Sequence, residues 1–196
     1  DGYQKIIDGA KQIVENYKPT IKIDPKWKMV ELDEVLDYEQ PTKYIVRSVD
    51  YNDQYPIPVL TAGKTFILGY TNEEEGIFKE NLPVIIFDDF TTASKFVDFP
   101  FKVKSSAMKI LHAKKDKADI RFLYYVIQKI KFTNDKHKRY WISEYSKIKI
   151  PLPPIEVQQQ IVAKIEEEQK IVEANKELIK IFEQKIKDKI SELWGK

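Results

Sequence analysis

The spacing of hydrophobic residues at the start of the chain predicts an amphipathic helix over residues 1–18. Hydrophobic side chains recur there at intervals of three and four residues, at Tyr3, Ile6, Ile7, Ala10, Ile13, Val14 and Tyr17. This spacing places them on one face of a helix. Residue 18 precedes a proline and is biased away from helical backbone angles, so the helix should end there. Residues 19–26 contain two prolines and are predicted to form an extended linker.

A second helical pattern, over residues 151–196, is longer and more regular. After the PLPP segment at 151–154 no proline or glycine occurs until Gly195, and hydrophobic residues recur at every seventh position. A helix of about 40 residues is about 60 Å long, and a heptad repeat of that length predicts a helical partner in a coiled coil. We expect the helical interface on Ile165, Val172, Ile179, Phe182 and Ile186. A long helix lying across its own domain is the alternative.

Residues 27–150, between the two helices, show the pattern of a mixed globular domain. Short runs rich in β-branched and aromatic residues, separated by proline and glycine, predict strands. These runs cover residues 44–49, 65–70, 82–87, 96–97 and 107–111, and one amphipathic helix is expected over residues 120–131. Strands and helices do not alternate regularly, which favours an α+β fold with a mixed β-sheet over a doubly wound sheet. We therefore expect three parts, with bounds 1–26, 27–150 and 151–196.

Composition excludes several classes of protein and of site. The chain of 196 residues has no cysteine, which rules out a disulfide framework, a cysteine zinc site and a thiol nucleophile. Its two histidines cannot form a multi-histidine metal site, so no metal is expected. No hydrophobic run approaches the roughly 18 residues of a membrane span, and the start lacks a signal-peptide pattern. We expect a cytoplasmic protein with no membrane partner, and the first residue, Asp1, suggests a piece of a longer chain.

Charge is unevenly distributed along the chain, although the net charge is only +2. Residues 31–94 hold 4 basic and 13 acidic residues, whereas residues 95–150 hold 15 basic and 5 acidic residues. A local excess of this size is typical of a surface that binds a polyanion such as nucleic acid. The alternative is a lysine-rich surface balanced by the acidic segment before it.

Known catalytic motifs are absent from the sequence. It has no G-x-G-x-x-G, P-loop, G-x-S-x-G or H-E-x-x-H pattern. Asp88 and Asp89 follow a hydrophobic run, where a strand end could present carboxylates, but the lysine spacing of a metal nuclease site is missing. A turn in which these side chains accept backbone N–H groups is the simpler interpretation. We expect no catalytic residue and no cofactor in this chain.

Four segments have the composition of nucleic-acid-binding loops: 40–54, 61–70, 91–95 and 136–141. Lysine, arginine and small polar side chains are the donors that proteins use on phosphates and base edges. The candidate DNA-binding residues in these segments are Lys43, Arg47, Lys64, Thr65, Thr92, Lys95, Lys136, Lys138, Arg139 and Tyr140. In the last segment, Trp141 is expected to be a core residue and His137 a polar surface residue.

Several stretches of the sequence resemble a known family. The pattern I-P-L-P-P-x-x-x-Q-x-x-I spans residues 150–161 and is followed by the long heptad helix. WKMVELDEV at 27–35 and VIIFDDFTTASKF from residue 84 add to the likeness. In these features the chain resembles the specificity (S) subunits of type I restriction-modification systems, and the resemblance covers essentially the whole chain.

The resemblance implies a function that the composition does not give. S subunits of this family usually hold two target recognition domains, each of which reads one half of a bipartite DNA site, joined by helices packed as an antiparallel coiled coil. These helices dock the modification (M) subunits, which use S-adenosylmethionine to methylate adenine, and restriction (R) subunits complete the nuclease. This chain has a single recognition domain. It is therefore expected to be a half-S subunit that forms a homodimer on a palindromic site, or the C-terminal part of a longer S subunit.

Double-stranded DNA is accordingly the expected partner, read in the major groove by loops of residues 31–150. Two interpretations from other classes remain open. One is a coiled-coil scaffold whose globular domain binds another protein, and the other is a nuclease.

Overall fold

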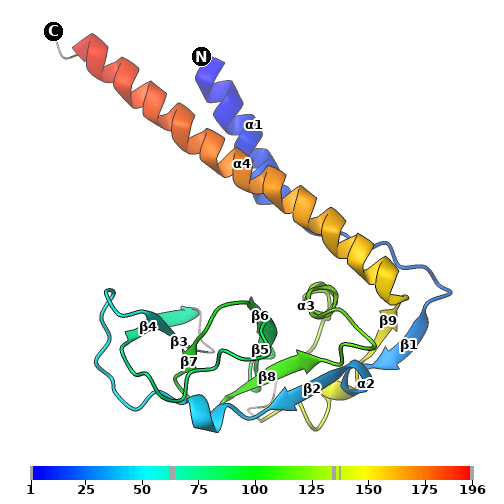
Figure 1. Cartoon of the computed structure of the whole chain (residues 1–196). Helices are drawn as coiled ribbons and strands as arrows, with labels where there is room; N and C mark the ends of the chain where they lie inside the picture. Colours follow the sequence, from blue (N-terminus) through cyan, green and yellow to red (C-terminus); the bar gives the residue numbers. More distant parts are fainter. Residues whose placement is uncertain (1, 62–64, 134–135, 137, 195–196) are drawn as a thin grey trace. The chain divides into compact units, whose positions relative to one another are not determined.

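The computed structural model describes residues 2–61, 65–133, 136 and 138–194, and it divides into two compact units. One unit is globular and comprises Ile23–Gln159. The other combines the two ends of the chain, Asp1–Lys22 and Gln160–Lys196. Figure 1 labels the helices and strands of both units.

The globular unit contains three small β-sheets with helices between and beside them, which confirms the predicted α+β class. Within the described residues, the strand orders are β1-β9, β2-β8-β5-β6 and β4-β3-β7. The strands are β1 (Lys28–Glu31), β2 (Leu36–Glu39), β3 (Ile57–Leu60), β4 (Ile67–Thr71), β5 (Val84–Asp88), β6 (Ser94–Val97), β7 (Lys102–Val103), β8 (Met108–Ala113) and β9 (Lys149–Leu152). The helices of this unit are α2 (Leu32–Val35), α3 (Ile120–Ile127) and the 3-10 helices η1 (Pro41–Tyr44) and η2 (Tyr145–Lys147).

The pairing of β1 with β9 joins the beginning and the end of the globular unit. The two strands are antiparallel, with Lys28 opposite Leu152 and Glu31 opposite Lys149. Among the other pairs, β3 and β7 are parallel and the rest are antiparallel, so the three-stranded sheet is mixed as expected and the four-stranded sheet is antiparallel.

The core of the globular unit lies around β5. Every residue of this strand is buried, because β5 has a neighbour on each side in the four-stranded sheet. Phe87 packs against Trp141 and Tyr145, with ring centroids 5.1 and 4.7 Å away. Trp141 is only 2% exposed, which confirms that it is a core residue. Burial of each large hydrophobic side chain contributes about 1.5–3 kcal/mol to the free energy of folding.

The strand predicted over residues 44–49 is wrong. Pro41 begins the 3-10 helix η1 instead, and Ile45 makes only an isolated bridge to Val103. The backbone N–H groups of Arg47 and Ser48 donate to the Glu73 carboxylate, so they are not available to a neighbouring strand. The helix predicted over residues 120–131 is also shorter than expected, since α3 ends at Ile127.

The other unit is a pair of antiparallel helices, α1 (Gly2–Asn16) and α4 (Ile155–Trp194), of which α4 begins in the globular unit. The Tyr3 and Phe182 rings lie 5.1 Å apart at one end, and the Tyr17 hydroxyl lies 3.3 Å from the Glu168 carboxylate at the other. Val172 of α4 and Ile7 of α1 are buried. The predicted long helix is therefore present, and α1 of the same chain covers part of its hydrophobic stripe.

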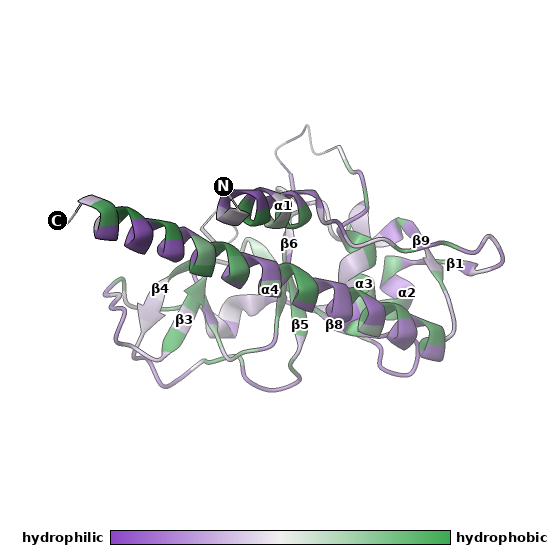
Figure 2. Ribbon diagram, turned by 90° about the horizontal axis from the view of Figure 1, so that it is seen from above, coloured by the Kyte–Doolittle hydropathy of each residue, from purple (hydrophilic) through white to green (hydrophobic). Residues whose placement is uncertain are grey.

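The predicted helical-interface residues lie along this stripe. Ile165 and Val172 are buried, and Ile179, Phe182 and Ile186 are half-buried. Figure 2 shows hydrophobic residues recurring along the length of α4.

Candidate nucleic-acid interface

The order of the four-stranded sheet brings two of the predicted DNA-binding segments to one end. Because its neighbouring strands are all antiparallel, the end of β2, the start of β8, the end of β5 and the start of β6 share that end. The segment after β2 carries Lys43 and Arg47, the turn before β6 carries Thr92, and Lys95 lies near the start of β6. The sheet therefore gathers residues that lie about 50 positions apart in the sequence.

The turn after β5 is held by Asp88. Its Oδ1 atom accepts the N–H groups of Phe90 at 2.9 Å and Thr91 at 3.2 Å, as the sequence favoured. Thr92 closes the turn with a φ of 59°, a left-handed backbone conformation that is uncommon for a residue other than glycine. The two hydrogen bonds to Asp88 hold the backbone in this conformation. The following residue, Ala93, is exposed to solvent.

The segment over residues 136–141 is joined to the same turn through Asp89. The Asp89 carboxylate accepts the Trp141 N–H at 2.8 Å, and the Asp89 carbonyl accepts the Tyr140 N–H at 2.9 Å. Next to these bonds, the Arg139 guanidinium lies 5.8 Å from the centre of the Phe90 ring. A third predicted segment thus lies beside the turn that carries Thr92.

A buried ion pair fixes the position of Asp89. The Nζ atom of Lys109, on β8, lies 3.0 Å from the Asp89 carboxylate, and each side chain is only 1% exposed. The same ammonium lies 5.5 Å from the centre of the Tyr38 ring. Asp89 therefore links a strand of the sheet to the backbone of the basic segment.

Tyr140 needs a revised role, because its side chain is only 1% exposed. Its hydroxyl donates to the Lys136 carbonyl and accepts the Lys136 N–H at 2.9 Å, so it closes the loop on itself. The ring does not offer a surface on which a base could stack. Lys136 and Arg139 are exposed, whereas Lys138 pairs with Glu144. His137 lies outside the described residues.

Lys43 is exposed but already has an acidic neighbour. Its Nζ atom lies 2.8 Å from the Glu39 carboxylate, which also accepts the Tyr44 hydroxyl at 3.0 Å. Burial raises the pKa of the Glu39 carboxyl, but the hydrogen bonds from Lys43 and Tyr44 and the nearby positive charge of Lys43 together outweigh burial and leave that pKa below its ordinary value. The same bond from Lys43 to Glu39 raises the pKa of the Lys43 ammonium. The Lys43 ammonium is therefore positively charged, and the nearby negative charge of Glu39 partly neutralises it.

Arg47 is held by its backbone rather than by its side chain. The Glu73 carboxylate accepts the N–H groups of Arg47 at 2.9 Å and Ser48 at 2.8 Å. Glu73 in turn lies 3.0 Å from Lys102 Nζ, which is 2% exposed. The Arg47 guanidinium makes only a loose contact with Glu75, at 3.7 Å, and both of those side chains are exposed. Contact with a phosphate could readily replace such a surface pair.

The remaining predicted segment, over residues 61–70, is described only in part. Thr65 is exposed in the connection between β3 and β4. Lys64 lies outside the described residues.

The positive charge exposed by residues 95–150 is smaller than their excess of basic residues in the sequence suggests. Among the described residues, four of its lysines pair with acids of the segment 31–94: Lys102 with Glu73, Lys109 with Asp89, Lys114 with Asp37 and Lys147 with Asp33. Lys102 and Lys109 are buried and cannot reach a ligand. Counting charges along the sequence does not show that these positive charges are neutralised, because the paired residues come together only in the folded chain.

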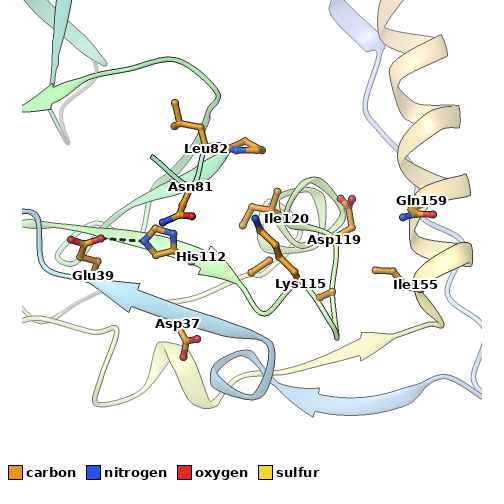
Figure 3. A pocket seen from close by; sticks show the side chains of 13 residues that line it. Asp37, Glu39, Asn81, Leu82, His112, Lys115, Asp119, Ile120, Ile155 and Gln159 are labelled. Atoms are coloured by element: carbon orange, nitrogen blue, oxygen red, sulfur yellow. Dashed lines mark ion pairs between the residues drawn. The ribbon is translucent and has the colours of Figure 1, made fainter. Parts of the chain in front are cut away.

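A cavity of about 570 Å³ lies between the four-stranded sheet and the start of α3. Figure 3 shows the carboxylates of Asp37, Glu39 and Asp119 around it, with His112 and Lys115. The Glu39 carboxylate lies 3.5 Å from His112, and Asp119 caps α3 by accepting two backbone N–H groups. An acidic lining of this kind disfavours phosphate. In the part of the chain that the structure describes, no group of three or more His, Cys, Asp or Glu side chains could hold a metal ion, and no helix is long and apolar enough to cross a membrane.

Comparison with known proteins gives a consistent result. A family model for the type I restriction modification DNA specificity domain matches residues 25–192. The specificity subunit of the Escherichia coli type I restriction enzyme EcoR124I/EcoR124II is 55% identical over 135 residues, which are 67% of this chain and 33% of that protein. This chain therefore spans about a third of the length of that curated relative.

Solved structures show the same fold at low sequence identity. A chain from a study of the assembly and conformational transition of the type I R-M system has a TM-score of 0.58 and 15% identity, with coverage of 93% of this chain and 50% of that one. The type I S subunit from M. genitalium has a TM-score of 0.59 and 12% identity, with coverage of 93% and 54%.

Proposed function

The chain belongs to the family of type I restriction modification DNA specificity domains, and from that premise we propose that it reads one half of a bipartite DNA sequence for a DNA methyltransferase. The main observation behind the proposal is that the candidate DNA-binding segments 40–54, 91–95 and 136–141 lie at one end of the four-stranded sheet. Exposed cations of these segments include Lys95, Lys136 and Arg139. They are suited to the phosphate contacts that fix a protein on the duplex.

The proposed mechanism is direct readout in the major groove. Flexible lysines hold the phosphates, and polar groups of the turn at Thr92 and of the segment around Arg47 and Thr65 discriminate between base edges. Each good bidentate base contact contributes about 1–3 kcal/mol of discrimination. The methyltransferase partner would flip the target adenine out of the helix, because a base inside the stack cannot be reached.

We assign the methylation chemistry to that partner, an M subunit that binds S-adenosylmethionine. This chain would bind no cofactor and carry no catalytic group, and it would act in the cytoplasm, where a restriction (R) subunit can join the complex. The fold supports a binding role rather than a nuclease, because the carboxylates of Asp88 and Asp89 both take part in structural interactions. Asp88 caps a turn and Asp89 is buried in an ion pair.

The helices offer a surface for a further protein. Outside the contact with α1, α4 exposes Ile171, Ile181, Ile190 and Leu193, between 51 and 69% each. Large hydrophobic side chains exposed along a helix favour burial against another protein surface, and a second helical pair would supply such a surface. A homodimer would place two recognition domains on a palindromic site, and pairing with a second recognition domain in a longer protein would place them on an asymmetric one. The M subunit would dock on the same helices.

Salt dependence of DNA binding tests the proposal. The full chain, purified with the M subunit of its system, should lose about 100-fold in affinity between 50 and 200 mM salt if it contacts about four phosphates. Weak binding that does not change with salt would contradict the proposal and would favour a scaffold that binds only protein.

A further inference from the structure

Two lysines of the globular unit are buried against carboxylates. Lys102 is 2% exposed with its Nζ atom 3.0 Å from Glu73, and Lys109 is 1% exposed with its Nζ atom 3.0 Å from Asp89. Removing both charges of a pair from water is costly, and well-packed hydrophobic residues often give equal stability in such places. Stability alone is therefore a weak reason for these two pairs.

In both pairs, the carboxylate also accepts hydrogen bonds from the backbone of another segment. Glu73 accepts the N–H groups of Arg47 and Ser48 at 2.9 and 2.8 Å, and Asp89 accepts the Trp141 N–H at 2.8 Å. Each carboxylate thus connects a lysine on a short strand, β7 or β8, to a segment that carries candidate DNA-binding residues. Hydrogen bonds between a backbone N–H and a charged carboxylate are shorter and stronger than those between neutral groups.

We infer that Lys102–Glu73 and Lys109–Asp89 are positioning pairs that set the sequence discrimination of the DNA-reading segments, and not their general affinity for DNA. The inference rests on the proposed function. A base-edge contact must be held within about 0.5 Å of its productive geometry. A phosphate contact made by a long, exposed lysine tolerates a larger displacement of the backbone, because the side chain adjusts.

The chain offers matched controls for a test of this inference. Asp89→Asn and Glu73→Gln remove the charge of each pair with little change of shape. Asp98→Asn and Glu80→Gln make the same chemical changes at exposed positions outside the candidate segments. The double variant Asp89→Asn/Lys109→Met leaves no lone buried charge, so it remains informative if Asp89→Asn does not fold.

Selection from a randomised DNA duplex library is the measurement, with the full chain and its M subunit. The wild type and both controls should enrich one sequence. In each folded positioning variant, the ratio of affinity for that selected duplex to affinity for a shuffled duplex should fall about tenfold, as for one lost base contact. Affinity for the shuffled duplex should change less than about twofold, because the phosphate contacts remain.

The outcomes separate the inference from the proposed function. If the wild type selects a sequence and the folded variants retain its affinity ratio, the inference is wrong and the proposed function stands. If both affinities fall by the same factor together with the melting temperature, the pairs are only structural and the inference is wrong. If the wild type enriches no sequence, the proposed function and the inference are both wrong.

Discussion

The hydroxyl of Tyr17 lies 3.3 Å from the carboxylate of Glu168, which joins the end of α1 to a helix 151 residues further along the chain. The same hydroxyl lies 3.3 Å from the Ile165 carbonyl. These contacts, the Tyr3–Phe182 ring contact and the burial of Ile7 on α1 and Val172 on α4 make α1 and α4 one packed pair.

Neighbouring positions on α4 test this packing. Val172 is 8% exposed and Ile171 is 58% exposed. Val172→Asp should destabilise the helix pair by about 3 kcal/mol or more, because it buries an uncompensated charge, and Ile179→Asp should act in the same direction. Amide hydrogen exchange should become faster throughout α1 in the Val172 variant, while the strands keep their protection. Equal exchange in Val172→Asp and Ile171→Asp would contradict the packing.

An exposed lysine at the proposed interface should contribute to the salt dependence of DNA binding. Lys95→Ala removes one phosphate contact, so the slope of log K against log salt should become shallower by about 0.9. The loss of affinity should be nearly the same for all DNA sequences. Lys79→Ala removes an exposed lysine outside the candidate segments and serves as the control. The same slope in both variants would place Lys95 away from the DNA.

The pair of Glu73 and Lys102 should make stability depend on pH. Burial raises the pKa of Glu73, but the hydrogen bonds from the Ser48 N–H, Lys102 and the Arg47 N–H, with the charge of Lys102, together outweigh burial, and that pKa lies below its ordinary value of 4.5. The ionised carboxylate therefore stabilises the folded state fully above about pH 4.5, and this contribution is lost as the pH falls through the lower folded-state pKa.

Glu73→Gln should accordingly cost about 3 kcal/mol at pH 7, since it leaves Lys102 buried without a charged partner. Urea denaturation of the wild type and the variant at several pH values measures the difference. The difference should begin to shrink below about pH 4.5, where the carboxyl of the unfolded wild type is protonated, and it should be lost once the pH falls below the lower folded-state pKa. A difference that stays constant from pH 7 to pH 3 would show that the charge of Glu73 is not responsible.

Periodic features of this protein were predictable from the sequence, and features that depend on distant pairing were not. The heptad spacing around Val172 predicted α4, because a helix maps such spacing onto one face. The strand expected over residues 44–49 does not form, because Glu73 takes the N–H groups that a strand would need. Nothing near residue 47 in the sequence indicates that competitor.

The candidate site shows the same limit. Lys95 and Lys102 are alike in the sequence, yet one is exposed and the other is buried beside Glu73. Tyr140 lies in a basic run that is typical of a surface loop, but its hydroxyl bonds to Lys136 and its ring is buried. Exposure of a polar or aromatic side chain in such a loop depends on the carboxylates and carbonyls that the fold brings to it.

Methylation-sensitive sequencing of a host genome, with and without the gene for this chain, tests the central claim most directly. With the gene present, adenine methylation should occur at nearly every copy of one bipartite motif, and deletion of the gene should abolish methylation at that motif alone. Restoring the gene with Asp98→Asn should restore the methylation. An identical pattern of adenine methylation with and without the gene would contradict the proposal that this chain gives a methyltransferase its DNA sequence specificity.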